Sequence, residues 1–435
     1  MNNKVGIRYE DRFELERRVA ITPALLKQLK EKEGLEFFVE KSAKRIFKDE
    51  EFVAAGAEIV DDVRPHAPVI FGVKEMPSGY FEANKTYIFF SHTIKGQSYN
   101  MASLKEMMEN KINLIDYEKI ANDNGQRLIF FGHFAGLAGM INSLWSLGLR
   151  LKAKGYDTPF AKLKQAYHYS SLEEVKAVIS EIGFEIAQNG LPKELNPLVI
   201  GFTGYGNVSK GAQEIAGLLP IKEITPAELL ELKGQDNPNN VLYKVVFKEK
   251  DLARRLDGSE FELQDYYGHP EKYEGTFEQY ISEITILMNC MYWDTRYPKL
   301  ITKEYLEDKF DESTHSLLVV GDVTCDPGGS VECTYDCTLI EDPIFVYNPK
   351  TGEVQKGAEG EGILVMAVDI LPSELPRESS EAFSSALAKF VAAVVRADYS
   401  KSFEDLDLPA PMKRALILHN GEFTPDFEYM KEYVK

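Results

Sequence analysis

The chain has 435 residues, which is too long for one ordinary hydrophobic core and predicts two or three domains. Hydrophobic residues make up 44% and charged residues 27%, an ordinary globular composition that argues against disorder. The formal net charge of −19 repels phosphate backbones and anionic lipid, so we expect small-molecule partners, no nucleic acid and no membrane. An anionic substrate would need a local cluster of Arg and Lys.

The cysteine content and the start of the chain bear on the compartment. Four cysteines in a chain of this length do not make a disulfide framework, which favours a reducing compartment. The opening MNNKVGIRYEDR is charged almost at once and lacks the apolar segment of a signal peptide. No apolar run approaches the roughly 20 residues needed to span a bilayer. We therefore expect a cytoplasmic protein.

In the first part of the chain, apolar runs alternate with amphipathic stretches. A strand over 4–8 is followed by a helix that begins at Pro23, with Thr22 as its N-cap. The further elements predicted here are strands at 36–40, 68–74, 86–92 and 112–118, helices at 49–55 and 100–111, and a long buried helix at 134–155. Strands interleaved with helices imply parallel pairing in an α/β layered domain.

A second α/β unit opens at 196–220. Buried strands of the parallel type are predicted at 284–293, 315–323 and 361–370, and an amphipathic helix follows at 375–398. Between about 234 and 283 the sequence becomes polar, aromatic and rich in turn residues. We interpret this segment as an insertion at the cleft of the second unit.

The sequence GFTGYGNVS places glycines directly after an apolar strand and before a helix. Such glycines allow a tight turn and a close backbone approach to a pyrophosphate, which then lies on the helix N-terminus. The pattern departs from GxGxxG because Ser209 stands at the third position and Gly211 follows, and an ordinary glycine-rich turn would look similar. The residues predicted to hold a dinucleotide are Gly204, Gly206, Asn207, Val208 and Ser209.

The choice between NAD and NADP depends on the end of the next strand, which carries the residue that reads the ribose. That strand is predicted to be PIKEI, ending at Thr225, with Lys222 and Glu223 inside it. Thr225 and Lys222 would suit a 2′-phosphate, whereas Glu223 could bind ribose hydroxyls. NADP is favoured and NAD stays possible.

Polar side chains follow three predicted strands of the first unit. Lys74 with Glu75, His92 and Glu118 each stand where a strand ends, and Lys95 lies close to His92 in the sequence. A single strand that finishes in a charged residue commonly just reaches solvent. Several such ends in one parallel sheet meet at the edge that lines a ligand crevice, which predicts a site there.

The residue types suit the reduction of an imine. A lysine in a protected site, here Lys74, can exchange a proton with the substrate amine, and His92 can act as an acid–base group near neutrality. Arg18 and Arg127 are candidates for binding substrate carboxylates with their planar forks, although either could form a surface ion pair instead.

Two other features suggest less specific chemistry. The spacing C-x7-C-x3-C of the last three cysteines matches no usual zinc pattern, so we expect no metal. The residues concerned are Cys325, Cys333 and Cys337, with His315 as a conceivable fourth ligand. The glycine-rich segment GDVTCDPGGS (321–330) closes a strand and could form a lip of the cofactor site.

Six stretches resemble a known family. ERRVAITP (16–23) and GVKEMP (72–77) are similar to the alanine dehydrogenase and transhydrogenase superfamily. The other four stretches resemble its saccharopine-forming branch, the lysine–ketoglutarate reductase half of bifunctional aminoadipic semialdehyde synthases. These stretches are FFSHTIKGQ (89–97), NGQRLIFFGHFAGLAGM (124–140), GNVSKGAQ (206–213) and DILPSELPRES (369–379).

The resemblance implies an α/β fold of two Rossmann-like parallel-sheet domains that form a clamp around a central cleft. The expected boundaries are 1–137 with 375–435 for the substrate side and 138–374 for the dinucleotide side. The family's acid–base pair matches Lys74 and His92. Its substrate-binding positions match Arg18, Glu75, Lys95, Glu118 and Arg127.

The reaction that the resemblance implies is the reductive condensation of L-lysine with 2-oxoglutarate to saccharopine, with NADPH. The saccharopine-cleaving half of the bifunctional relatives is expected to be absent, because the sequence ends at Lys435. Alternatives are an NAD-dependent saccharopine dehydrogenase, an alanine dehydrogenase-like enzyme, or a ligand-binding paralogue without turnover. The oligomeric state is not predicted.

Overall fold

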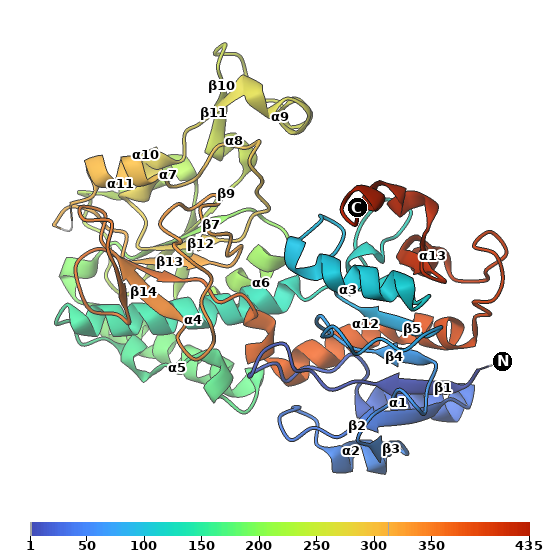
Figure 1. Cartoon of the computed structure of the whole chain (residues 1–435). Coiled ribbons are helices and arrows are strands. Elements are labelled where there is room, and N and C mark those ends of the chain that lie inside the picture. The colour runs from blue at the N-terminus through green and yellow to red at the C-terminus, as the bar shows by residue number, and fades with distance from the viewer. Residues whose placement is uncertain (1, 312) are drawn as a thin grey trace. The chain divides into compact units, whose positions relative to one another are not determined.

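The chain divides into two units, each built around an eight-stranded sheet (Figure 1). The computed structural model describes residues 2–311 and 313–435. The first unit combines the chain up to Phe131 with Pro376–Lys435, and the second is Gly132–Leu375. The first boundary falls ahead of residue 137 because helix α4 begins at Gly132 and belongs to the second unit throughout.

The sheet of the first unit has the strand order β18-β17-β6-β5-β4-β1-β2-β3. The six strands from the N-terminal part pair in parallel, whereas β17 and β18 add an antiparallel edge. Their bounds are Lys4–Ile7 for β1, Glu36–Glu40 for β2, Glu58–Val60 for β3, Val69–Phe71 for β4, Thr86–Phe89 for β5, Asn113–Asp116 for β6, Leu416–His419 for β17 and Glu422–Phe423 for β18. The C-terminal part of the chain therefore completes the first sheet.

The helices of the first unit follow from local signals. α1 (Pro23–Glu33) begins where the Thr22 side chain accepts a hydrogen bond from the Leu25 amide, and it ends at Gly34 in the left-handed conformation. α12 (Pro376–Arg396) packs against α1, and the hydroxyl groups of Ser380 and Ser384 accept hydrogen bonds from backbone amides just before α1. The remaining helices are α2 (Asp49–Ala54), α3 (Ser98–Glu109), α13 (Ala410–Arg414), and the 3-10 turns η1 (Tyr117–Lys119) and η7 (Pro425–Glu432).

The sheet of the second unit has the order β15-β14-β16-β13-β12-β7-β9-β8. β8, β9, β7, β12, β13 and β16 pair in parallel, each with the next in this order. β14 and β15 add an antiparallel edge, which the sequence pattern did not predict. The bounds are Val199–Thr203 for β7, Ile221–Ile224 for β8, Leu242–Phe247 for β9, Ile286–Asn289 for β12, Val319–Asp322 for β13, Ile344–Tyr347 for β14, Val354–Lys356 for β15 and Ile363–Met366 for β16.

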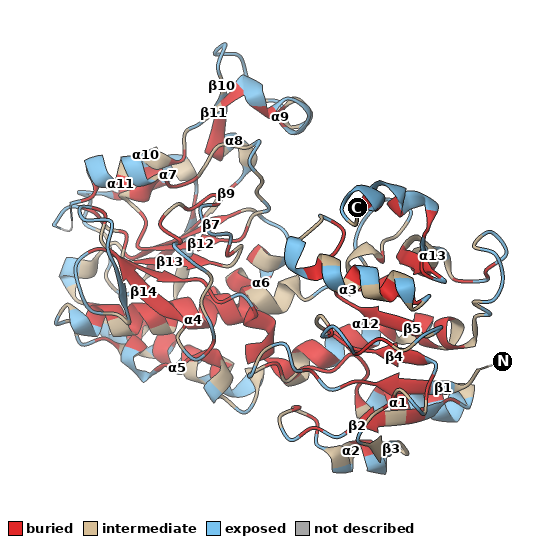
Figure 2. Cartoon of the chain, viewed as in Figure 1, coloured by how far each residue is buried: buried red, intermediate tan, exposed pale blue. Residues whose placement is uncertain are grey.

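The long helix α4 (Gly132–Ala153) is buried along most of its length (Figure 2). It crosses α6 (Asn207–Ala216) at two glycines: a Cβ on Gly136 would lie 1.8 Å from the Val208 carbonyl oxygen, and one on Gly211 would lie 2.1 Å from the His133 carbonyl oxygen. Only glycine allows the two backbones to approach this closely. The crossing fixes the helix that follows the glycine-rich turn.

The other helical elements of the second unit are short apart from α5. They are α5 (Leu172–Asn189), α7 (Pro226–Leu232), α8 (Glu249–Leu252), α9 (Leu263–Gly268), α10 (Glu278–Ile281) and α11 (Lys303–Lys309), with the 3-10 turns η2 (Pro159–Lys162), η3 (Ala166–His168), η4 (Lys193–Leu195), η5 (Pro270–Lys272) and η6 (Leu371–Glu374). No helix among the described residues is both long and apolar enough to cross a membrane.

The insertion predicted at about 234–283 includes residues that belong to the main sheet. β9 lies inside that range, yet it is an interior strand of the main sheet, hydrogen-bonded to β7 on one side and to β8 on the other. The sequence hid this strand because its neighbours are polar and rich in turn residues. The segment that leaves the sheet begins after β9 and carries α8, α9 and a two-stranded ribbon of β10 (Ala253–Arg255) and β11 (Tyr273–Gly275).

Candidate active site

The polar residues predicted in the first unit follow adjacent parallel strands. β4, β5 and β6 lie side by side, and Lys74, His92 and Glu118 come shortly after their respective ends. The backbone pairing continues past the end of β4, because the Phe90 amide donates to the Val73 carbonyl. These three side chains are therefore attached to one edge of the first sheet.

His92 is held in a fixed orientation by Glu75. The ring Nδ1 lies 2.7 Å from Glu75 Oε1, and the His92 side chain is 30% exposed. The backbone of His92 adopts a left-handed conformation with φ of +48°, and the Asn100 side-chain amide donates to its carbonyl at 3.2 Å. Burial alone would raise the pKa of the Glu75 carboxyl, but the hydrogen bond and charge of His92 and the charge of Lys74 lower it.

The Glu75–His92 pair leaves Nε2 as the ring atom that can meet a ligand. A carboxylate on Nδ1 favours the tautomer that carries its proton on Nδ1, and it fixes the orientation of the ring. Glu75 uses Oε1 to position the histidine, while its Oε2 has no hydrogen-bond partner among the described residues, so the predicted role of Glu75 in substrate binding stays a prediction.

The backbone of Lys74 is positioned by a buried acid that no sequence pattern indicated. Glu10 is 5% exposed, and its two carboxylate oxygens accept hydrogen bonds from the amides of Val73 and Lys74 at 2.7 and 2.9 Å. Burial raises the pKa of Glu10 to about 7. Lys74 Nζ lies 5.5 Å from the ring centroid of Phe13. In the sequence, Glu10 stood in the charged stretch RYEDR, which looks like a solvated loop.

Arg18 is buried and already engaged by a neighbouring carboxylate. Its Nε and Nη2 donate to the two oxygens of Glu16 at 2.8 and 2.6 Å, and its guanidinium carbon lies 4.2 Å from the ring centroid of Phe131. Burial would raise the pKa of the Glu16 carboxyl, but the charge and hydrogen bonds of Arg18 lower it below its usual value. The bidentate edge of Arg18 that was expected to hold a substrate carboxylate is therefore occupied by Glu16.

A buried aspartate braces the ends of two strands. Asp116, the last residue of β6, is fully buried and accepts hydrogen bonds from the Ser91 amide at 3.0 Å and from the Ser91 hydroxyl at 2.5 Å. Its other oxygen accepts from the Glu118 amide at 2.8 Å, and burial raises its pKa. Asp116 therefore fixes the backbone on which both His92 and Glu118 stand.

Lys95 and Arg127 are exposed, in contrast to Arg18. The Lys95 amide donates to the Gln97 side chain, and Arg127 pairs through its backbone with Ala121. Neither side chain forms an ion pair with another described residue. Both can therefore turn toward a ligand.

In the second unit, the glycine-rich turn joins β7 to α6. Gly204 has a φ of +81°, and Gly206 is the N-cap of α6. A Cβ on Gly206 would meet nothing within 4 Å, so the space in front of the helix N-terminus is open.

The three residues after Gly206 differ in what they can offer a ligand. Asn207 is exposed and Val208 is half-buried in the first turn of α6. Ser209 is fully buried, and its hydroxyl accepts a hydrogen bond from the Gln213 side chain at 2.9 Å. Its side chain is therefore not directed at a ligand in front of the helix.

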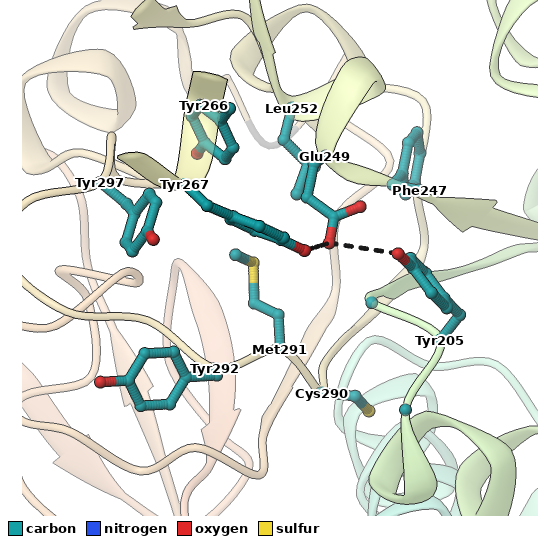
Figure 3. Close-up of a pocket in the computed structure, with 12 residues that line it drawn as sticks. Tyr205, Phe247, Glu249, Leu252, Tyr266, Tyr267, Cys290, Met291, Tyr292 and Tyr297 are labelled. Carbon is teal, nitrogen blue, oxygen red and sulfur yellow. Dashed lines mark hydrogen bonds between the residues drawn. The ribbon is translucent and has the colours of Figure 1, made fainter. Parts of the chain in front are cut away.

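A cavity of about 370 Å³ opens beside the glycine-rich turn (Figure 3). Its walls come from the ends of β7, β9 and β12 and from the segment that leaves the sheet after β9. The lining residues are Gly204, Tyr205, Gly206, Phe247, Glu249, Leu252, Tyr266, Tyr267, Cys290, Met291, Tyr292 and Tyr297. The cavity is mainly aromatic and apolar, and Glu249 carries the one carboxylate among the described residues that line it.

Thr225 does not line this cavity, which corrects the predicted cofactor-reading position. β9 lies between β7 and β8, so the end of β8 is two strands away from the glycine-rich turn, or about 9–10 Å. The Thr225 hydroxyl is used as the N-cap of α7, where it bonds to Glu228. Glu223 is paired with Lys244 at 2.7 Å. Local sequence patterns do not show that the next strand along the chain is not the next strand in the sheet.

A buried hydrogen-bond network braces the strand ends of the second unit. Asn289, at the end of β12, donates to Asp322 at the end of β13 at 2.8 Å, and Thr203 of β7 donates to Asn289 at 3.1 Å. The Thr334 hydroxyl donates to the second oxygen of Asp322 at 2.6 Å, and burial raises the pKa of Asp322. The network ties the segment after β13 to the sheet.

The cysteines lie in and around that segment. The Cys325 thiol donates to the Ala367 carbonyl and the Cys337 thiol donates to the Cys325 carbonyl, both at 2.8 Å. All four cysteines are free thiols, and Cys290 lines the cavity beside the glycine-rich turn.

Comparisons with known proteins agree with the motifs. Residues 6–138 match the family described as alanine dehydrogenase/PNT, N-terminal domain, and residues 135–426 match alanine dehydrogenase/PNT, C-terminal domain. The solved structure of an L-alanine dehydrogenase covers 99% of this chain and 100% of its own, with a TM-score of 0.63 and 18% identity. This likeness confirms the expected α/β fold of two Rossmann-like domains. The clamp and its central cleft stay a prediction.

Two groups of curated proteins are similar in sequence. An alpha-aminoadipic semialdehyde synthase of Arabidopsis thaliana is 40% identical over 99% of this chain and 41% of its own length. The mitochondrial alpha-aminoadipic semialdehyde synthase of Rattus norvegicus is 35% identical over 98% of this chain and 47% of its own length. A saccharopine dehydrogenase [NAD(+), L-lysine-forming] of Emericella nidulans is 27% identical over 89% and 90%. The chain thus spans less than half the length of the synthases that it matches.

Proposed function

Because this chain belongs to the alanine dehydrogenase/PNT family, we propose that it is a nicotinamide-dependent oxidoreductase that condenses L-lysine with 2-oxoglutarate to form saccharopine. The observation that carries the proposal is the arrangement of Lys74 and the Glu75–His92 pair after adjacent strands of the first sheet. The synthases that are 35–40% identical over nearly the whole chain support this substrate choice over alanine.

The proposed chemistry joins the ε-amine of lysine to the keto carbon of 2-oxoglutarate. The amine adds to the carbonyl to give a carbinolamine, which loses water to give an imine. His92, through Nε2, donates a proton to the departing hydroxyl group and is oriented for this by Glu75. When bound, a reduced nicotinamide would supply a hydride to the imine carbon, so that the carbon–nitrogen double bond becomes the single bond of a secondary amine. Lys74 exchanges the proton on the substrate nitrogen.

The residues of the second unit fit a dinucleotide. The open space at Gly206, in front of the first turn of α6, allows a pyrophosphate to approach backbone amides. Gly204, Gly206, Asn207 and Val208 would hold the phosphates through the backbone, and the aromatic cavity beside them has room for an adenosine. Ser209 would contribute only its backbone.

Substrate carboxylates require cations at the first sheet's edge. We assign this role to Arg127 and Lys95, whose side chains are exposed and not held by another described residue. Nη1 of Arg18 can take part as well, because Glu16 bonds only to Nε and Nη2 of that side chain. Glu118 would bind the α-ammonium group of lysine. The small-molecule partners are thus lysine, 2-oxoglutarate and saccharopine, and a cytoplasmic location stays a prediction from the cysteine content.

The other functions in this family are distinguished by substrate and cofactor. The saccharopine dehydrogenase similarity favours the reverse, lysine-forming direction as the second candidate, with NAD. NADP was favoured from Thr225 and Lys222, but neither residue lines the cavity beside the glycine-rich turn. These two residues therefore no longer support a preference for NADP.

An absorbance assay that follows the cofactor directly tests the proposal. The purified chain is incubated with lysine, 2-oxoglutarate and NADH or NADPH, and oxidation of the reduced cofactor is followed. The reverse reaction is followed with saccharopine and NAD⁺ or NADP⁺. We expect turnover only when both lysine and 2-oxoglutarate are present, and saccharopine as the product by mass spectrometry. Turnover with pyruvate and ammonia instead would point to alanine dehydrogenase activity, and no turnover with any pair would refute the proposal.

A further inference from the structure

The strand order of the second sheet brings an acidic residue to the glycine-rich turn. β9 pairs with β7 over its whole length, with Thr203 opposite Phe247. The chain then turns, and Glu249 follows two residues after β9. Glu249 and the two glycines of the turn line the same cavity. Glu249 therefore occupies the place at the end of the neighbouring strand from which a dinucleotide's ribose is read.

Two tyrosines fix the carboxylate of Glu249. The Tyr267 hydroxyl donates to Oε1 at 2.7 Å and the Tyr205 hydroxyl lies 3.4 Å from the same oxygen (Figure 3). Tyr205 comes from the glycine-rich turn and Tyr267 from α9, so Glu249 joins the turn to the segment outside the sheet. Both bonds use Oε1, which leaves Oε2 free to accept a hydrogen bond from a ligand.

The charge of the cavity has one sign. Glu249 is the only charged residue among its described lining residues, and no Lys or Arg lines it. Lys248 is exposed, and its Nζ lies 5.9 Å from the Tyr205 ring centroid, outside the lining. A ribose 2′-hydroxyl can donate to a carboxylate, whereas a 2′-phosphate would bring its negative charge to Glu249 with no cation among the described lining residues.

We infer that Glu249 binds the 2′- and 3′-hydroxyls of the adenosine ribose and makes NAD(H), not NADP(H), the cofactor of this chain. Tyr205 and Tyr267 are positioning residues that hold the carboxylate in place. The aromatic and apolar walls, including Tyr266, Leu252 and Met291, accept the adenine. The inference rests on the proposed dinucleotide site at the glycine-rich turn, but not on the identity of the substrates.

The test is a fluorescence titration of the whole chain with NADH and with NADPH, without substrates. For the unmodified chain, we expect NADH to bind at least about tenfold more tightly than NADPH. Glu249→Gln should reduce this ratio, and Glu249→Arg should reverse it, because the new cation attracts the 2′-phosphate. Tyr267→Phe should weaken NADH binding by a smaller factor, since it loosens the carboxylate without removing its charge.

Thr225→Asp is the matched control. Aspartate keeps the N-cap of α7 and adds a carboxylate at the end of β8, the position that the sequence order alone would select. The NADH to NADPH ratio should stay unchanged in this variant. Circular dichroism and thermal melting of each variant separate a loss of fold from a change of preference.

The outcomes distinguish the cofactor inference from the proposed reaction. Tighter binding of NADPH by the unmodified chain, or an unchanged ratio in both Glu249 variants, would overturn the role of Glu249. Binding of neither nucleotide would overturn the dinucleotide site and with it the inference. NADH binding with the expected variant pattern would support the inference even if lysine and 2-oxoglutarate gave no turnover, which would refute the proposed reaction alone.

Discussion

The residues that follow the strand ends differ between the two sheets, although both sheets are largely parallel. In the first unit, the strand ends carry ionisable residues that acidic side chains hold in place: Glu10 holds the backbone of Lys74, and Glu75 holds the His92 ring. In the second, the strand ends carry glycines and tyrosines around a cavity whose described lining has a single carboxylate. The first surface suits proton transfer and the second suits binding of a planar ligand and its phosphates.

Both units brace these ends in the same way. Asp116 is the last residue of β6 and bonds to Ser91 after β5, and Asp322 is the last residue of β13 and bonds to Asn289 of β12. Each aspartate is buried, and burial raises its pKa. A carboxyl group at a strand end can accept several hydrogen bonds from a neighbouring strand, which fixes the edge on which a site is built.

The largest effect is expected at the charged edge of the first unit. Lys74→Met and His92→Gln should each lower turnover by about 10²-fold or more while NADH binding is retained, because proton transfer is lost and the second unit is untouched. Steady-state rates and nucleotide titrations check this. Near-normal rates in both variants would remove the acid–base assignment.

A pair of glycine variants separates fold from binding in the second unit. Gly211→Ala should lower the free energy of unfolding by about 1–3 kcal/mol, since its methyl group would meet the His133 carbonyl oxygen of α4. Gly206→Val should leave the melting temperature unchanged, because its side chain enters open space, yet it should abolish nucleotide binding. Equal thermal stability of the two variants would contradict the close approach of α4 and α6.

The two arginines should respond differently to the same substitution. Arg127→Lys should raise the Michaelis constant for one substrate by about tenfold without a change in stability, because a point charge cannot replace the planar fork. Arg18→Lys should also lower the free energy of unfolding by about 1–3 kcal/mol, since the buried bidentate bonds to Glu16 are lost. Kinetics and chemical denaturation of both variants give the comparison. Identical behaviour would argue against it.

The last effect concerns Glu10 and depends on pH. Its pKa is about 7 in the folded chain against 4.5 as the ordinary value, so the folded state binds more protons between these limits. The contribution of Glu10 to stability is therefore present below about pH 4.5 and is lost as the pH rises through 7, by at most about 1.4 kcal/mol per pH unit. Chemical denaturation from pH 5 to 8 measures the free energy of unfolding of the unmodified chain and of Glu10→Gln. The value for the unmodified chain minus that for the variant should fall as the pH rises. A constant difference would refute the shift.

Much of the architecture could be predicted from local patterns. Thr22, Pro23 and Gly34 mark the ends of α1 through their own backbone and side-chain preferences, and the burial of β4, β5 and β6 follows from their apolar runs. The glycine-rich turn was visible because a strand, two glycines and a helix follow one another directly in the sequence. The same holds for Lys74 and His92, which stand beside the ends of their strands.

The tertiary structure alone decided which residues meet. Two placements depend on long-range pairing: Glu10 accepts from the amides of Val73 and Lys74, and β9 separates β8 from β7. Local propensity carries no information about the order of strands in a sheet or about the burial of a charged loop. Sequence by itself determined the elements and the chemistry at their ends. Packing decided that Glu249, and not Thr225, stands beside the glycine-rich turn, because strand neighbours are set by the hydrogen bonds of the whole sheet.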